Sequence, residues 1–425
     1  MALLSLLSLF TIIALGFWRK VNVGLLAIAM VVILGYGSSQ FSERELISGF
    51  STSLFITLLG VTLFFSVVQN SGALEVVMKN VVRRIGGRIY LVPVAMFVMG
   101  YVLSAIGPGC VPALAFVAVI AVPLSHRTGY NSIMLMLIGD VATYSGRFSM
   151  ITPEGVLVTQ LMSQSGIEIN LVQMMLNTGI GAGVLALIFF FAYGGHRVRA
   201  FSGGNADGGA GVDSFSRINP LSTQQKVVLL SIVLMVLCVV LFNMNVGLAS
   251  FLMTVLLLLA RVENEKSAIS CIPWPTLIMV GGVGMLMNLV SKSGGIDIII
   301  GTINQISTPA TLITVTGAVT GIMSWFSSTI GVVLPTMLPT VASLIGSSDG
   351  AISAIELVSV IGIISSTAGF SPVSTVGALI MSANESDSAQ NKIPQARLFI
   401  TLFLWSLFCV VFLSLLAWLG VFGLF

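Results

Sequence analysis

Three ionisable side chains stand close together in one apolar stretch of the first half of the chain. Asp140, Arg147 and Glu154 follow one another at intervals of seven residues, so they share one helix face if the helix continues. Ionisable groups inside a membrane span are costly and usually mark a pathway or a pair. Two interpretations therefore stay open: Arg147 clamps a substrate carboxylate, or it forms an internal ion pair with Asp140 or Glu154.

Hydroxyl-bearing residues gather at two further places, beside residues that interrupt helices. Ser327, Ser328 and Thr329 form one run, and residues 365–375 hold a second group around Gly369. Serine and threonine also join membrane helices to one another, so each single hydroxyl has packing as its alternative role. Clustering beside glycine and proline favours a ligand-facing role for both groups.

Enzyme chemistry has little support in these residues. The sequence contains no HExxH motif and no GxxxxGK[ST] loop, which argues against a metalloprotease and against ATP-driven transport. His126 and His196 fall at expected membrane edges beside arginines, which favours interfacial positions over a proton relay. The four cysteines are scattered and form no CxxC pair, so neither a disulfide framework nor a metal centre is expected.

The composition is that of a polytopic membrane protein. Hydrophobic residues make up 56% of the 425 residues, charged residues only 8%, and the mean hydropathy is +1.07, whereas soluble domains carry about 25% charged residues. The first apolar segment, 1–18, is followed rather than preceded by Arg19 and Lys20. That order predicts a retained span with its N-terminus outside, and not a signal peptide.

An internal repeat organises the chain. Several segments recur 222 residues later, although recurrence of Gly and Ser by chance is the alternative. The matches at this spacing are Gly60 with Gly282, Ser71 with Ser293, Gly109 with Gly331, and Phe148-Ser149 with Phe370-Ser371. We therefore expect a first repeat over 1–195, a polar linker over 196–226 and a second repeat over 227–425.

Basic residues in short loops, which mark the cytoplasmic side, follow alternate spans in the two halves. The second repeat is therefore expected to be inverted, with five spans and one re-entrant hairpin in each half. The hairpins are expected at about 91–124 and 310–345, and broken helices at about 145–155 and 365–377. The expected fold is an all-α, multi-pass protein of the bacterial inner membrane, with both termini periplasmic and the linker cytoplasmic.

Broken helices at membrane mid-depth provide amide groups for an anion and carbonyl groups for a cation. The expected substrate-binding residues are Gly107, Pro108, Gly109, Arg147, Ser149, Thr152, Ser327, Ser328, Thr329, Ser371, Ser374 and Thr375. The expected coupling-ion residues are Gly107, Asp140, Ser145, Ser328, Thr367 and Gly369. Sodium is the candidate ion, and no other metal or cofactor is expected.

The segments 60–72, 107–112 and 369–374 resemble the MatC-type malonate and dicarboxylate carriers of the ion transporter superfamily, which includes the divalent anion/sodium symporters. The resemblance implies a homodimeric elevator that carries a small organic anion, such as malonate or a C4 acid, by sodium or proton symport. Its partners are then the anion and membrane lipid, without nucleic acid. A cation/proton antiporter or oxyanion exporter on the same fold is the alternative.

Two departures from the family pattern leave the substrate open. The resemblance implies that Ser327-Ser328-Thr329 stands where such carriers have a Ser-Asn-Thr tip and that Gly107-Pro108-Gly109 stands at its first-half equivalent. Both tips depart from that signature, and the lost Asn removes one carboxylate-binding amide. Arg147-Phe148-Ser149-Met150 stands where the pattern resembles Gly-Phe-Ser-Pro, which the second half keeps at 369–372. Glu154 follows shortly after, and a charged pair of Arg147 and Glu154 at this point indicates a substrate other than a simple C4 dicarboxylate.

Overall fold

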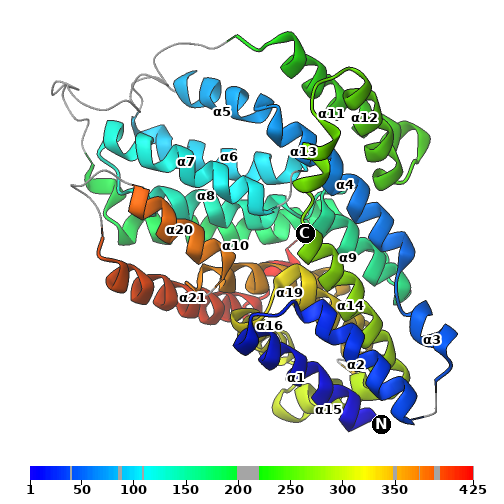
Figure 1. Ribbon diagram of the computed structural model, residues 1–425. Helices are drawn as coiled ribbons and strands as arrows, with labels where there is room; N and C mark the ends of the chain where they lie inside the picture. The colour runs from blue at the N-terminus through cyan, green and yellow to red at the C-terminus, as the bar shows by residue number, and fades with distance from the viewer. Residues whose placement is uncertain are drawn as a thin grey trace.

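The computed structural model describes residues 1–38, 41–84, 89–107, 110–198, 220–347, 352–372, 374–386 and 393–424. Within these ranges the regular structure is helical, without strands (Figure 1). In the described part of the chain, seven helical segments are long and apolar enough to cross a bilayer, and further apolar helices are shorter. This confirms the predicted all-helical, multi-pass membrane class.

The first half contains ten α-helices in its described part. They are α1 (Ala2–Arg19), α2 (Val23–Ser38), α3 (Glu43–Ser48), α4 (Thr52–Asn70), α5 (Ala73–Arg84), α6 (Val92–Ile106), α7 (Cys110–Thr128), α8 (Ser132–Gly146), α9 (Pro153–Gln164) and α10 (Leu171–Ala192). Short 3-10 turns, η1 (Ile89–Leu91) and η2 (Gly195–Arg197), precede α6 and follow α10.

The second half repeats this order, but the segment after α16, which corresponds to α7, is divided into short helices of different types. It contains α11 (Thr223–Phe242), α12 (Val246–Leu259), α13 (Glu265–Ser270), α14 (Trp274–Lys292), α15 (Gly295–Ile306), α16 (Leu312–Phe326), the π-helix η4 (Thr329–Val333), α17 (Leu334–Met337), η5 (Leu338–Thr340), α18 (Val341–Ser347), α19 (Ala354–Thr367), η6 (Ala368–Phe370), α20 (Thr375–Ser386), α21 (Gln395–Trp418) and η7 (Val421–Gly423). A shift of 222 residues carries the bounds of α3, α4, α5 and α9 onto those of α13, α14, α15 and α20.

Helices of each half pack against helices of the other half. The long helix α4 of the first half packs on α12 of the second, and α14 of the second half packs on α2 of the first. Figure 1 shows the result as two groups of helices, one with α11, α12 and α13 beside α4 and α5, the other with α1, α2 and α15 beside α14. Between them lies a core in which α8 contacts α6, α7 and α10, and α19 contacts α16 and α21.

Glycine makes both of these contacts between the halves close. A Cβ atom at Gly60 would overlap the carbonyl oxygen of Gly247, and one at Gly282 would overlap that of Gly24. Small residues let membrane helices approach until their backbones touch, and this approach is a main source of their association. The same glycine–glycine contact thus occurs twice, once between α4 and α12 and once between α14 and α2.

Replacing Gly282 by alanine is expected to lower the thermal stability of the purified protein, because the new methyl group must push α14 away from α2. Overpacking of this kind costs about 1–3 kcal/mol. The matched control is Gly284→Ala in the same helix, since no atom lies within 4 Å of a Cβ built there. Equal melting temperatures for the two variants would contradict the close contact.

The predicted helix interruptions are present. Helix α6 ends at Gly107, whose φ of +126° suits glycine and whose Cβ would fall on the ring of Phe65; Pro108 and Gly109 lie outside the described residues. Helix α16 ends before Ser327, and Ser328 caps η4. Non-helical backbone also separates α8 from α9 and η6 from α20.

Candidate functional site

One cavity of about 310 Å³ lies where the interrupted helices meet. Its polar lining from the first half comes from the start of α7 and the end of α8, as Cys110, Tyr144 and Arg147. From the second half it comes from the tip of the second hairpin and the break after α19, as Ser324, Ser327, Ser328, Thr329, Ser366 and Ser374. Of the lining residues described, Arg147 alone carries a charge.

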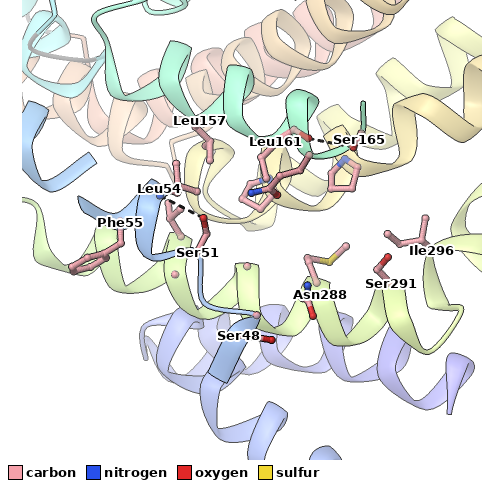
Figure 2. A pocket seen from close by; sticks show the side chains of 18 of the residues that line it. Ser48, Ser51, Leu54, Phe55, Leu157, Leu161, Ser165, Asn288, Ser291 and Ile296 are labelled. Carbon is pink, nitrogen blue, oxygen red and sulfur yellow. Dashed lines mark hydrogen bonds between the residues drawn. The ribbon is translucent and has the colours of Figure 1, made fainter. Parts of the chain in front are cut away.

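A second cavity is larger, about 560 Å³, but lies elsewhere. Figure 2 shows it between Leu54 of α4 with the preceding cap residue Ser51, Asn288 of α14, and Leu157 and Leu161 of α9. None of the residues predicted to bind substrate or ion lines it. The smaller cavity is therefore the candidate site.

Arg147 forms an internal ion pair and also faces the cavity. Its side chain is only 4% exposed, and its Nη2 lies 3.2 Å from Oε1 of Glu154. Its Nη1 donates a hydrogen bond of 3.1 Å to Oγ of Ser366, at the end of α19 in the other half. Of the two partners that the sequence left open, the structure places Glu154 beside Arg147. Nε of Arg147 has no hydrogen-bond partner among the described residues.

Glu154 also holds the first residue of α7. Its Oε1 accepts a hydrogen bond of 3.1 Å from the backbone N–H of Cys110, and the Glu154 side chain is 1% exposed. The first amides of a helix lack partners within the helix and carry partial positive charge. Residues 107–109, the Gly-Pro-Gly tip, have no side-chain acceptor to offer, so the carboxylate from α9 supplies it.

The two helix breaks have the same backbone bonding. In the first, Oγ1 of Thr152 accepts from the Gly155 N–H and donates to the Arg147 carbonyl. In the second, Oγ of Ser374 accepts from the Gly377 N–H and donates to the Gly369 carbonyl. These residues correspond at the 222-residue shift. The breaks differ in side chains, because Arg147 and Glu154 correspond to glycine and valine.

The second hairpin tip is fastened to the end of α19. The hydroxyls of Ser324 and Thr329 both donate to the carbonyl oxygen of Ser365, over 2.6 Å and 3.0 Å. Ser327 donates to the Met323 carbonyl. Ser328 instead accepts from the Gly331 N–H at 3.2 Å, which leaves its hydroxyl hydrogen to donate toward the cavity.

The predicted site residues divide into two groups in space. Six line the cavity: Arg147, Ser327, Ser328, Thr329, Gly369 and Ser374. Seven do not: Gly107, Asp140, Ser145, Ser149, Thr152, Thr367 and Ser371. Pro108, Gly109 and the Thr375 side chain lie outside the described residues.

Several residues of the second group form hydrogen bonds that hold the backbone near the site. Ser149 donates to the Ala105 carbonyl and so ties the first break to α6. Thr152 caps α9, and Thr367 donates to carbonyls of its own helix. Asp140 is 2% exposed on α8, and its Oδ1 has no hydrogen-bond partner among the described residues.

Sequence reasoning missed Cys110, Tyr144, Ser324 and Ser366 as lining residues. Ser366 belongs to a hydroxyl-rich run that the sequence did mark, although it was not singled out there. Tyr144 and Cys110 carry no local signal, because a tyrosine and a cysteine in apolar helices read as ordinary packing residues.

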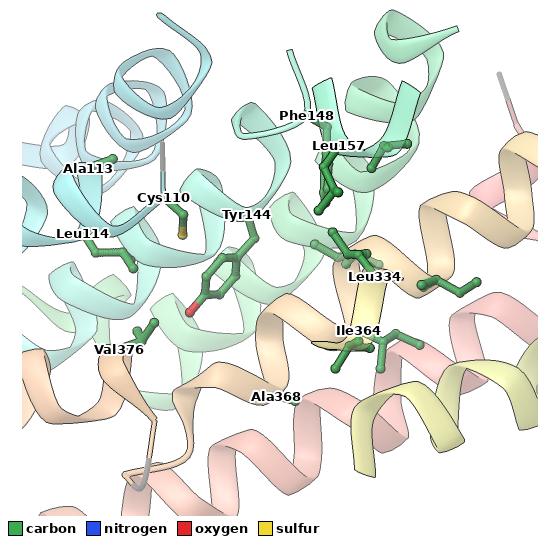
Figure 3. Close-up of a cluster of buried hydrophobic side chains, with 14 of the residues drawn as sticks. Cys110, Ala113, Leu114, Tyr144, Phe148, Leu157, Leu334, Ile364, Ala368 and Val376 are labelled. Carbon is green, nitrogen blue, oxygen red and sulfur yellow. The ribbon is translucent and has the colours of Figure 1, made fainter. Parts of the chain in front are cut away.

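The hydroxyl of Tyr144 is a donor without an internal partner. The side chain is 1% exposed, and the hydroxyl forms no hydrogen bond with the described residues. Its ring packs edge-on against Phe370 at 5.3 Å. Figure 3 shows the hydroxyl directed away from α8, toward Val376. A buried polar group of this kind is costly unless a ligand or water satisfies it.

Tyr144→Phe is therefore expected to leave the melting temperature unchanged or raised, while anion binding weakens by about tenfold, the worth of about one hydrogen bond to a charged group. Thermal-shift titration of the purified protein measures both quantities. The control is Tyr36→Phe, which removes the hydroxyl of an exposed tyrosine. Unchanged anion affinity in Tyr144→Phe would exclude this hydroxyl from the site.

Comparison with known proteins agrees with this architecture. The family model of the dicarboxylate carrier protein MatC N-terminus matches residues 1–146, which confirms the resemblance to MatC-type carriers over that segment. No curated protein matches the sequence.

Two solved transporters share the fold. The YdaH transporter of Alcanivorax borkumensis aligns with a TM-score of 0.54 and 12% identity, over 89% of this chain and 88% of its own. MtrF of Neisseria gonorrhoeae, described as representing a class of antimetabolite efflux pumps, aligns with a TM-score of 0.59 and 12% identity, over 92% of this chain and 83% of its own. The carrier-family match and the shared fold indicate a multi-pass membrane transporter and not an enzyme.

Proposed function

We propose that this protein is a secondary active transporter of a small organic anion, coupled to sodium or protons and working by symport. The observation that carries the proposal is the 310 Å³ cavity in which a buried guanidinium meets the ends of helices from both halves. An ATP-driven mechanism has no motif in the sequence to support it.

An anion fits the donors that face this cavity. Arg147 supplies positive charge, and Ser328 and Tyr144 supply hydroxyl hydrogens. Helix starts at the same place add partial positive charge from their first amides. A coupling cation has two candidate positions: the unpartnered carboxylate of Asp140 on α8, and the backbone carbonyl oxygens beside the second break, where Gly369 and Ser374 line the cavity.

The cation/proton antiporter and the oxyanion exporter are less well supported. An antiporter needs an acidic side chain that exchanges cations at the site, and the sequence offered Asp140 and Glu154 for this role. Glu154 is already engaged by Arg147 and by the N–H of Cys110. Asp140 does not line the cavity. The geometry therefore favours anion transport.

We further propose that the halves, 1–195 and 227–425 with the linker 196–226 between them, are inverted repeats. The alternation of basic loops supports opposite orientations in an inner membrane, with both termini outside and the linker in the cytoplasm. The matching helix contacts across the two halves support a symmetric relation between them.

We also propose that the protein is a homodimer and that the core helices of each subunit move like an elevator. The larger cavity supports this movement, because it is lined by α4 and α14 on one side and by α9 and the short helices after α16 on the other. One wall carries Leu54 and Leu277, and the facing wall carries Leu157 and Pro335. Space between two such walls allows the core helices to slide against α4 and α14.

Uptake into proteoliposomes tests the proposed function. Purified protein is reconstituted, and the accumulation of labelled carboxylates, sulfonates and amino acids is followed under an inward sodium gradient, an inward proton gradient, or neither. We expect at least one carboxylate to accumulate under one of the gradients and not without it. If no anion accumulates above protein-free vesicles under either gradient, anion symport is excluded.

A further inference from the structure

We infer that the transported anion presents one carboxylate to the site, because Glu154 already occupies one of two equivalent carboxylate positions. This inference rests on the proposed anion transport and specifies its substrate class. It departs from the dicarboxylates that the matching family model names.

The two positions are equivalent because the two breaks are built alike. Thr152 and Ser374 make the same pair of hydrogen bonds, to residues that correspond at the 222-residue shift. Each break stands beside the tip of its own hairpin: Ser149 bonds the end of α6, and the carbonyl of Ser365 accepts from Thr329. A symmetric dianion would therefore place one carboxylate in each half.

In the first half that position is filled. Oε1 of Glu154 lies between the N–H of Cys110 at 3.1 Å and Nη2 of Arg147 at 3.2 Å. A helix-start amide and a guanidinium are the donors that protein sites use for a ligand carboxylate. With 1% of its side chain exposed, Glu154 leaves no opening for a second carboxylate beside it.

In the second half no side chain fills the corresponding position, while the amide that corresponds to that of Cys110, the Val332 N–H, bonds the Ser328 carbonyl. Glycine and valine, Gly369 and Val376, replace the charged pair there, and both line the cavity. The free donors nearby are the hydroxyls of Ser328 and Tyr144, while Ser327 and Thr329 already donate to carbonyls. Together with Nε of Arg147, which has no partner in the described structure, they suffice for the two oxygens of one carboxylate.

The charges at the site agree with a single carboxylate. Arg147 is the charged residue among those described as lining the cavity, and Glu154 offsets it. A dianion would bring two negative charges that no lining side chain balances, whereas a monoanion brings one, which a single coupling cation can balance. Burying uncompensated charge is costly, so the second carboxylate is disfavoured.

The test compares each diacid with its own monoester, which differs in having one carboxylate masked. Competition by succinate and monomethyl succinate, and by malonate and monomethyl malonate, is measured against a labelled anion that the wild-type protein accumulates. We expect each monoester to compete at a concentration at least about tenfold lower, equivalent to 1.4 kcal/mol. A diacid that competes as well as its monoester, or better, overturns the inference and leaves anion transport standing. If no anion accumulates, the proposed function itself fails.

A variant tests the role of Glu154 directly. Glu154→Ala empties the first position, so we expect the preference for monoester over diacid to fall by at least about tenfold. Glu168→Ala removes an exposed acid outside both cavities and should keep the wild-type preference. An unchanged preference in folded Glu154→Ala would refute the filled-position argument. The comparison on wild-type protein remains decisive if this variant does not fold.

Discussion

Replacing Arg147 by alanine is expected to abolish anion accumulation and to destabilise the protein. The guanidinium is the positive charge in the lining of the 310 Å³ cavity, and it joins Glu154 of the first half to Ser366 of the second. Its removal leaves the Glu154 carboxylate 1% exposed and without its ion-pair partner. Breaking a buried pair in this way costs about 3–5 kcal/mol.

Two further variants separate loss of transport from loss of stability. Arg147→Met combined with Glu154→Met removes both charges together, and buried pairs replaced by apolar residues keep or gain stability. We expect the double variant to recover most of the melting temperature that Arg147→Ala loses, less the hydrogen bond from the Cys110 N–H to Glu154, and still to fail to accumulate anion. Arg44→Ala, at an exposed position on α3, is the control and should match the wild type in both measurements. Accumulation at the wild-type rate by the stable double variant would show that Arg147 only holds the fold.

The interruptions of the helices were predictable because their causes are local. Glycine at 107 permits a positive φ, and serine at 328 caps the short helix that follows. The 222-residue spacing seen in a few matched residues recurs in the bounds of whole helices. Such signals depend on neighbouring residues and on self-similarity, both of which a single sequence contains.

The partner of Arg147 was not predictable by the same route. A continuous helix would have made Asp140 and Glu154 equal candidates, because each is seven residues, or about two helical turns, from Arg147. The structure ends α8 at Gly146 and begins α9 at Pro153, so the chain turns between them. Glu154 then reaches Arg147 across the turn, whereas Asp140 remains on α8. Spacing along a sequence therefore misleads where the helix on which it is counted ends.

The remaining lining residues come together only through packing of the two halves. Ser366 reaches Arg147 from 219 positions away in the sequence, and Tyr144 meets Phe370 in the same way. The hydroxyl runs were marked as ligand-facing as groups. Within them Ser328 faces the cavity with a free hydrogen, while Ser365 and Thr367 donate to carbonyls of their own helix. Nothing in the sequence distinguishes these cases.

Asp140→Asn is expected to separate transport from its coupling to the cation gradient. Asp140 is 2% exposed, and its Oδ1 has no partner among the described residues. It lies one helical turn before Tyr144 on α8 and does not itself line the cavity. A charged carboxylate in such a place needs a proton or a cation to offset it. We expect binding of that cation to be what links Asp140 to the anion in the cavity.

Asparagine keeps the shape of the side chain and removes the charge, so the variant should fold with an unchanged or raised melting temperature. Gradient-driven accumulation should fall by about tenfold or more, within the usual range of coupling free energies of about 1–3 kcal/mol. Exchange of labelled for unlabelled anion, which needs no net cation movement, should stay within about twofold of the wild type. Glu43→Gln, an exposed acid on α3, is the control and should behave as the wild type. If Asp140→Asn still accumulates anion against its gradient at the wild-type level, the coupling cation binds elsewhere. The carbonyl oxygens around Gly369 would then be the next position to test, because that residue already lines the cavity.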